Sequence, residues 1–138
     1  MTTPRTIDAK RSATMRAVKS KNTSPELFVR RFIHSLGYRY SLHRKDLPGS
    51  PDLTFRRLRK VLFVHGCFWH GHDCLRGARV PKTNREYWER KIERNRERDR
   101  DTITKIGSLG WSVHVTWECE LHDSEGEALK KIEIFLRS

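Results

Sequence analysis

Residues that bind metals or transfer protons are concentrated in one ten-residue stretch, from His65 to Cys74. This stretch, HGCFWHGHDC, contains three histidines and two of the three cysteines of the chain. Thiolate and imidazole groups are the usual ligands of structural zinc, and imidazole also exchanges protons near neutral pH. Packing alone does not explain this density, so we interpret the stretch as one loop that serves both a structural zinc site and part of a catalytic centre.

A structural zinc ion needs four ligands arranged in a tetrahedron. Cys67, Cys74 and the only other cysteine, Cys119, supply three, and His70 or His72 is positioned in the sequence to supply the fourth. The odd number of cysteines argues against a purely paired disulfide framework, and cysteines close to histidines favour metal binding or catalysis in a reducing compartment. The spacing fits no zinc-finger pattern, and the alternative is three unrelated buried thiols.

Three acidic residues are candidates to complete a catalytic centre with this loop. Asp52 follows a proline at the start of a strand, Glu26 lies in the first turn of a helix, and Asp99 interrupts the apolar face of a long helix. Carboxylates suit Mg2+, and a buried acid must be paired, so Asp99 is expected to support a histidine or lysine of the loop. Each also has a simpler interpretation. Asp52 is then an ordinary turn residue, and Glu26 only complements the helix dipole. Asp99 is solvated if the apolar face has been drawn one residue off.

Three helices are predicted to carry or support these residues. The first starts with Ser24 as its N-cap and Pro25 in its first turn, and it ends at Gly37 in a left-handed conformation. The second spans about 83–106, and a capping box at 124–127 opens the third. The inward stripe of the second helix repeats every three or four residues: Trp88, Ile92, Asn95, Asp99, Ile103 and Ile106.

Four strands are predicted between these helices. A short strand lies within 38–43, and a hairpin joins residues 52–55 to the apolar run at 60–64, which delivers His65. The alternating segment 111–117 arrives from a helix, so we expect it to join the sheet in parallel. The length and these elements predict a single domain of the α/β class.

The composition narrows the class of protein. The chain has 138 residues, and its 29 lysines and arginines against 17 acids give a formal net charge of +12. Such an excess favours nucleic acid as the partner, although an incidentally basic surface or a ribosomal role has the same signature. Residues 1–23 read as a basic arm that orders on nucleic acid or as a solvated tail. No signal peptide or membrane-spanning run is found, so we expect a cytoplasmic, nucleoid-associated protein that does not bind membranes.

Several motifs in order resemble the very-short-patch-repair (Vsr) DNA mismatch endonucleases. The resemblance runs from about Lys10 to Leu121 and rests on these segments: MRA at 15–17, LPGSPD at 47–52, VHGCFWH at 64–70, YW at 87–88, ERD at 97–99 and WEC at 117–119. It implies a central mixed β-sheet flanked by helices, similar to the fold of the type II restriction endonucleases, together with a structural zinc site. The implied activity is Mg2+-dependent nicking of double-stranded DNA, 5′ of the thymine in a T:G mismatch left by deamination of 5-methylcytosine.

The resemblance also implies roles for individual residues. The catalytic set would be Asp52 as the Mg2+ ligand, His65 and His70 around the scissile phosphate and attacking water, Glu26 as an assisting acid and Asp99 as the residue that orients His70. The zinc ligands would be Cys67, His72, Cys74 and Cys119. The side chains that insert into the DNA would be Phe68, Trp69, Trp88 and Met15. Without the resemblance, the three aromatic residues read as ordinary core.

The chain departs from the restriction-enzyme pattern at one point. Where that pattern places Asp/Glu-x-Lys on the second strand, this chain has Phe63-Val64-His65, so the second acid is absent and His65 stands for the lysine. Metal binding must then rely on Asp52, water, phosphate oxygens and the backbone carbonyl of Val64.

Two competing functions are compatible with the same residues. One is a related restriction-type endonuclease with another mismatch or site specificity, and the other is a non-catalytic, zinc-stabilised DNA-binding module. The module has no need of Asp52 together with His65 and His70, which favours an enzyme. We expect a monomer that binds double-stranded DNA with a T:G mismatch. A mismatch-repair protein is a candidate partner that the sequence does not identify.

Overall fold

The computed structural model describes residues 23–138 except 75, 76 and 79. The predicted arm therefore lies outside the described residues apart from Thr23, and so does Met15. In chain order the elements are α2 (Ser24–Ser35), β1 (Ser41–Leu42), β2 (Leu53–Phe55), β3 (Lys60–His65), α3 (Arg85–Ser108), β4 (Ser112–Trp117), α4 (Glu118–Asp123) and α5 (Glu125–Arg137).

The four strands form one mixed sheet in the order β1-β2-β3-β4. The pairs β1–β2 and β2–β3 are antiparallel, whereas β4 lies parallel to β3, with Val61 opposite Val113 and His65 opposite Trp117. Both the hairpin and the parallel placement of β4 are confirmed. The predicted strand at 38–43 is reduced to two residues, because only Ser41 and Leu42 pair with β2.

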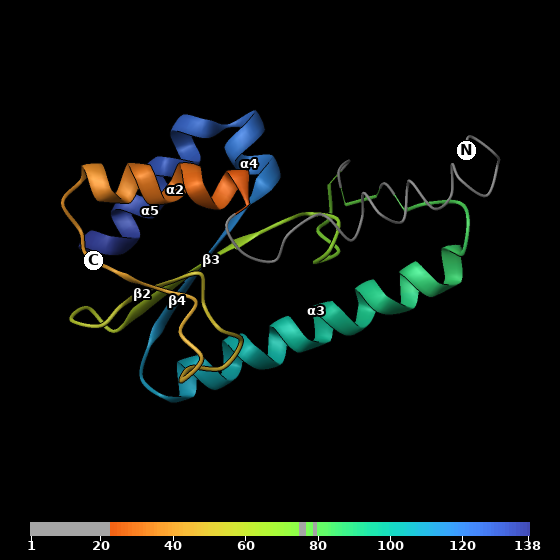
Figure 1. The fold of residues 1–138 in the computed structure, drawn as a ribbon, viewed down its shortest axis with the longest axis horizontal. Helices are drawn as coiled ribbons and strands as arrows, with labels where there is room; N and C mark the ends of the chain where they lie inside the picture. The colour runs from red at the N-terminus through yellow and green to blue at the C-terminus, as the bar shows by residue number, and fades with distance from the viewer. Residues whose placement is uncertain (1–22, 75–76, 79) are drawn as a thin grey trace, which may run out of the picture.

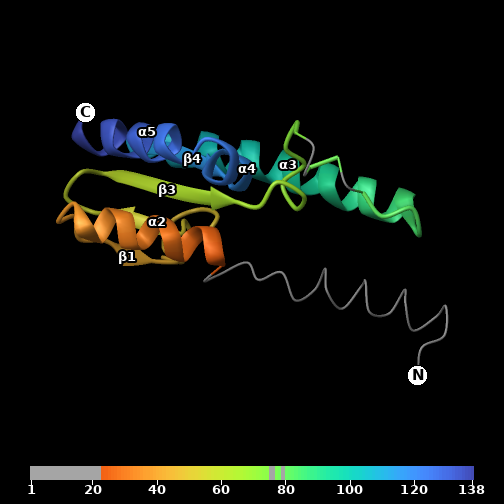
Figure 2. The ribbon, with the colours of Figure 1, turned by 90° about the horizontal axis from the view of Figure 1, so that it is seen from above.

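Helices cover both faces of the sheet (Figure 1). α2 and α5 pack on one face around Leu53, Phe55 and Leu62, and α3 covers the other face, where Ile106 meets Val61 and Phe63. Seen from above, α2 lies over the β1–β2 side and α5 beside β4 (Figure 2). β3 is thus buried on both faces, which explains its continuous apolar run. The expected α/β architecture is confirmed.

The ends of two helices differ from prediction. Thr23, not Ser24, caps α2, because its side chain accepts a hydrogen bond from the Glu26 amide at 3.3 Å. Gly37, with φ of 89°, follows the helix as expected. The capping box at α5 is wrong: Ser124 makes no side-chain cap bond, since it sits in the bend between α5 and the unpredicted helix α4.

The stripe predicted on α3 is correct, although the helix runs two residues later, from Arg85 to Ser108. Ile92 and Ile106 are buried, and Trp88, Asn95, Asp99 and Ile103 are half-buried. The N-terminal half of α3 extends past the sheet, beside the loop that follows β3 (Figure 1). Among the described residues, no helix is both long and apolar enough to cross a membrane.

One buried lysine ties the sheet to α5. Lys60 begins β3 with 6% of its surface exposed, and its ammonium donates to the carbonyls of Phe135 at 2.6 Å and Ser138 at 2.5 Å. A cation is favourable at the C-terminal end of a helix, where backbone carbonyls lack partners within the helix. The contact offsets the desolvation of Lys60 and fixes the end of α5 against β3.

Candidate functional site

Three groups of metal-binding side chains are found in the described part of the chain. Within each group the ligand atoms all lie within 4.8 Å of one another. They are Glu26 with His43 and Asp52, His65 with His70 and Asp99, and Cys67 with His72, Cys74 and Cys119. Every sequence-predicted catalytic or zinc side chain falls into one of these groups, and His43 is an addition that sequence reasoning missed.

Asp52 is fixed to the strand that carries His65. β2 runs antiparallel to β3, so the residue before β2 lies next to the end of β3. There Asp52, only 8% exposed, accepts a hydrogen bond from the Val64 amide at 2.7 Å. The pKa of Asp52 is raised to about 7: burial is the largest cause and the nearby Glu26 adds to it, while the Val64 hydrogen bond and Arg30 oppose the shift. Asp52 is thus fixed to the backbone of the residue before His65, although its ionised form is unfavourable there.

Glu26 reaches the same place from the start of α2. Its side chain is 1% exposed and pairs with the Arg30 guanidinium and with His43, whose Nε2 lies 2.9 Å from Glu26 Oε2. His43 Nε2 also lies 3.9 Å from Asp52 Oδ1. The sequence gives His43 no regular spacing to either acid. Its approach depends on a left-handed backbone, with φ of 48°, just after β1.

The second group joins β3, the loop and α3. The rings of His65 and His70 stack in parallel with centroids 3.7 Å apart, and His70 Nδ1 lies 2.6 Å from Asp99 Oδ2. His70 therefore donates to the carboxylate from the predicted stripe of α3. His65 is 5% exposed, and burial, reinforced by His70, lowers its pKa to about 3, so it is neutral at pH 7. Among the described residues, its buried Nδ1 has no hydrogen-bond partner.

The third group joins the loop to the first turn of α4, directly after β4. Cys67 is fully buried, its sulfur accepts from the Cys119 amide at 3.4 Å, and the Cys119 sulfur lies 3.4 Å from His72 Nδ1. Burial raises the pKa of the Cys67 and Cys119 thiols, which a bound cation would reverse. Since His70 is engaged by Asp99, the fourth member is His72. Three thiols and one imidazole suit a tetrahedral metal ion.

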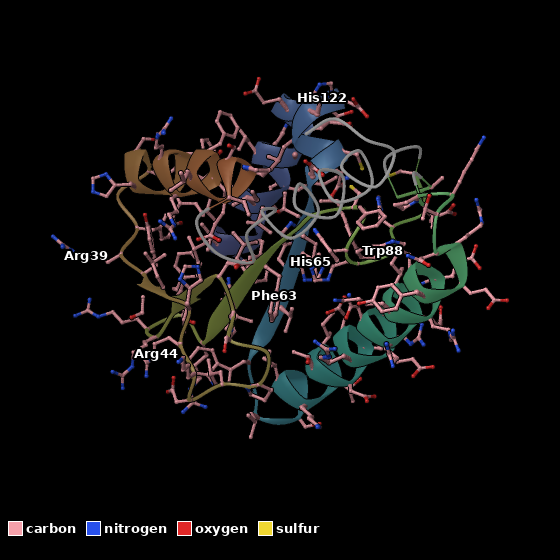
Figure 3. The ribbon with its side chains drawn as sticks, turned by 45° about the vertical axis from the view of Figure 1, so that its right-hand side comes forward. Arg39, Arg44, Phe63, His65, Trp88 and His122 are labelled. Atoms are coloured by element: carbon pink, nitrogen blue, oxygen red, sulfur yellow. The ribbon has the colours of Figure 1, made fainter. Side chains whose placement is uncertain are left out.

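Aromatic side chains form a fourth feature beside these groups. Phe68 and Trp69 on the loop and Trp88 on α3 contact one another with centroids 5.1–5.9 Å apart. The Lys91 ammonium lies 5.7 Å from the Trp69 ring and 6.0 Å from the Trp88 ring. All three rings are half-buried and belong to neither hydrophobic core. In Figure 3, His65 lies between the sheet and α3, and Trp88 lies farther toward the N-terminal end of α3.

Comparisons with known proteins agree on one family. The model of the family described as DNA mismatch endonuclease Vsr matches residues 5–76. The type II nicking enzyme V.XorIIP of Xanthomonas oryzae is 53% identical over 121 residues, which cover 88% of each chain. The type II nicking enzyme V.NmeAIP of Neisseria meningitidis is 43% identical over 82% of this chain and 80% of its own. The DNA mismatch endonuclease Vsr of Escherichia coli is 40% identical over 85% of this chain and 74% of its own.

Proposed function

Because the chain belongs to the Vsr family of DNA endonucleases, we propose that it nicks double-stranded DNA 5′ of the thymine in a T:G mismatch, using Mg2+. The observation that carries this proposal is the hydrogen bond from the Val64 amide to Asp52. It fixes the Asp52 carboxylate to the backbone amide of the residue before His65, and a carboxylate that can hold Mg2+ together with the stacked histidines His65 and His70 suits phosphodiester hydrolysis. We further propose that the mixed sheet is of the type II restriction endonuclease kind.

Asp52 and the backbone carbonyl of Val64 are the proposed Mg2+ ligands. The donor set fits, because both atoms are hard oxygens at one end of β3, and the raised pKa of Asp52 marks a carboxylate that a cation would stabilise. When bound, Mg2+ supplies positive charge to the phosphate in the transition state. Asp52 would hold the ion, and Glu26 would add negative charge from the start of α2.

The two imidazoles are proposed to handle protons and orient the attacking water. His70 donates through Nδ1 to Asp99, so its Nε2 is left as the proton acceptor, and we assign the attacking water to His70. His65 is neutral at pH 7 because of its burial, so it acts by hydrogen bonding to phosphate or water. Positioned acid–base groups of this kind typically contribute about 10²–10⁴ in rate.

Zinc is the proposed ion of the Cys67, His72, Cys74 and Cys119 group. A set of three thiolates and one imidazole is typical of structural zinc and leaves no open position for chemistry. The ion would join the loop to the first turn of α4, and residues 67 and 119 are 52 positions apart. It would thereby hold in place the histidine and aromatic residues of the same loop.

Phe68, Trp69 and Trp88 are the proposed reading group for the mismatch. A T:G pair is easier to unstack than a matched pair, and inserted rings recover part of a cost of a few kcal/mol by stacking. Lys91 lies over two of these rings and adds positive charge for the phosphate backbone. Intercalation by Met15 stays a prediction, as do a monomeric state and any mismatch-repair partner.

A nicking assay tests the proposal. Duplexes with a single T:G, T:A or C:G pair at one position, labelled on the thymine or cytosine strand, are incubated with the zinc-loaded protein and Mg2+. We expect a single nick 5′ of the mismatched thymine and none in the matched duplexes. Equal nicking of matched duplexes would favour a restriction-type enzyme, and mismatch binding without nicking would favour a non-catalytic module.

A further inference from the structure

His43 is placed as a third side chain able to bind a metal ion, beside the two buried carboxylates of Glu26 and Asp52. Its Nε2 is 2.9 Å from Glu26 Oε2 and 3.9 Å from Asp52 Oδ1, and its side chain is 13% exposed. The backbone amide of His43 also donates to the Asp52 carbonyl at 3.2 Å, so the two residues are linked in two ways. His43 holds an uncommon left-handed φ of 48°, and such conformations outside glycine cluster at functional sites.

The distances among these three donors suit one ion. Two ligands about 2.1 Å from a metal are about 3 Å apart when they subtend a right angle, and about 4 Å apart when they lie on opposite sides. The separation of 2.9 Å, which is also a hydrogen-bonding distance, matches adjacent positions around a single cation, and 3.9 Å falls between adjacent and opposed positions. The Arg30 guanidinium pairs with Glu26 and offsets part of the negative charge of the two carboxylates.

We propose that His43 is a nitrogen ligand of the catalytic cation in this chain, and that the site therefore prefers a first-row transition ion such as Mn2+ over Mg2+. The inference rests on the proposed function, which places a divalent ion on Asp52. Mg2+ favours oxygen ligands almost exclusively, whereas imidazole is a normal ligand of the transition series. A site of two carboxylates and one imidazole therefore discriminates between Mn2+ and Mg2+ more strongly than a site of carboxylates and carbonyls alone.

Mn2+ binding measured by electron paramagnetic resonance tests this assignment without using activity. The full chain is first loaded with one equivalent of Zn2+, so that the thiol group is filled. Mn2+ is then titrated, and Mg2+ is used to displace it. The variants are His43→Asn, which tolerates a positive φ, and His43→Gln, which keeps the reach to Glu26. His122→Gln is the matched control, because His122 is 67% exposed on α4 (Figure 3).

Both His43 variants are expected to lose about tenfold in Mn2+ affinity while their Mg2+ affinity stays within about threefold, and the control should be unchanged. An unchanged ratio of Mn2+ to Mg2+ affinity in both variants would overturn the inference and leave His43 as a hydrogen-bonding residue only. Asp52→Asn should remove the Mn2+ site and Asp99→Asn should not. The reverse result would move the ion to the histidine pair and overturn the inference.

The same preparations separate this inference from the proposed function. A protein that binds Mn2+ through His43 but nicks no T:G duplex supports the metal assignment and refutes the proposed activity. A protein that nicks T:G duplexes, but whose metal preference does not depend on His43, supports the proposed activity and refutes the metal assignment.

Discussion

Replacing Asp52 by asparagine is expected to abolish nicking and to stabilise the fold. Ionised Asp52 is unfavourable in the folded protein, because its pKa is raised from 3.8 to about 7, chiefly by burial and then by Glu26. A shift of about three units corresponds to roughly 4 kcal/mol at pH values above 7. Asparagine carries no charge, and its Oδ1 can still accept from the Val64 amide.

The pKa of about 7 already includes the opposing effect of Arg30, but burying the polar amide of asparagine also has a desolvation cost, which reduces the expected gain. We therefore expect Asp52→Asn to raise the free energy of unfolding by about 1–3 kcal/mol at pH 8, and the melting temperature by roughly 4–12 °C. The sign follows from linkage: a raised carboxyl pKa makes the wild type lose stability as pH rises through the window from about 4 to about 7. The gain of the variant should consequently be largest above pH 7 and vanish near pH 4.

The assay is thermal unfolding of the zinc-loaded proteins without added Mg2+, from pH 4 to 8. Asp46→Asn is the control, because Asp46 is exposed, pairs with Arg44 and has a lowered pKa, so its removal should give no gain at any pH. Mg2+ should raise the melting temperature of the wild type but not of Asp52→Asn. A variant no more stable than wild type at pH 8, or a difference independent of pH, would refute the account of Asp52 as a strained, buried carboxylate.

Three further predictions follow from the other groups. Removing the metal with a chelator, or replacing Cys119 by serine, should lower the melting temperature by several degrees and release about one zinc per chain on elemental analysis; a zinc-free protein of unchanged stability would remove the site. Trp69→Ala should reduce the preference for T:G over matched DNA more than it reduces general DNA affinity, measured by competition binding; equal losses on both duplexes would count against a reading role. Asp99→Asn should lower kcat about 10–100-fold with little change in DNA affinity, since the acceptor of His70 loses its negative charge; an unchanged single-turnover rate would show that the pair is structural only.

Much of the fold could be predicted because its signals are long and regular. The apolar run of β3, the alternation in β4 and the α3 stripe each extend over enough residues to fix the type of element and its inward face. Asp99 illustrates this strength, because the stripe alone placed it on the side where His70 lies. α4 was missed because a six-residue helix contains fewer than two turns, too few for any periodicity.

The parts of the site that escaped prediction depend on backbone turns. His43 joins the two acids only through a left-handed residue after a two-residue strand, and neither feature leaves a pattern in the sequence. The choice between His70 and His72 was open for the same reason, since the loop has no regular spacing. In the structure His72 lies with the three cysteines, and His70 is engaged through its Nδ1 by Asp99, 29 positions away.

α3 touches the loop at two places one turn apart and also carries Trp88, one of the proposed reading rings. Asn95 donates to the Trp69 carbonyl at 2.9 Å, Asp99 engages His70, and Trp88 lies eleven residues before Asp99. A continuous helix keeps these last two residues at a constant separation, about 16 Å along its axis. If a base pair does not let Trp88 stack, α3 is displaced, and Asp99, the acceptor of His70, moves with it. Discrimination between duplexes should then be expressed in how fast the bound strand is cut, and not only in how tightly it is held.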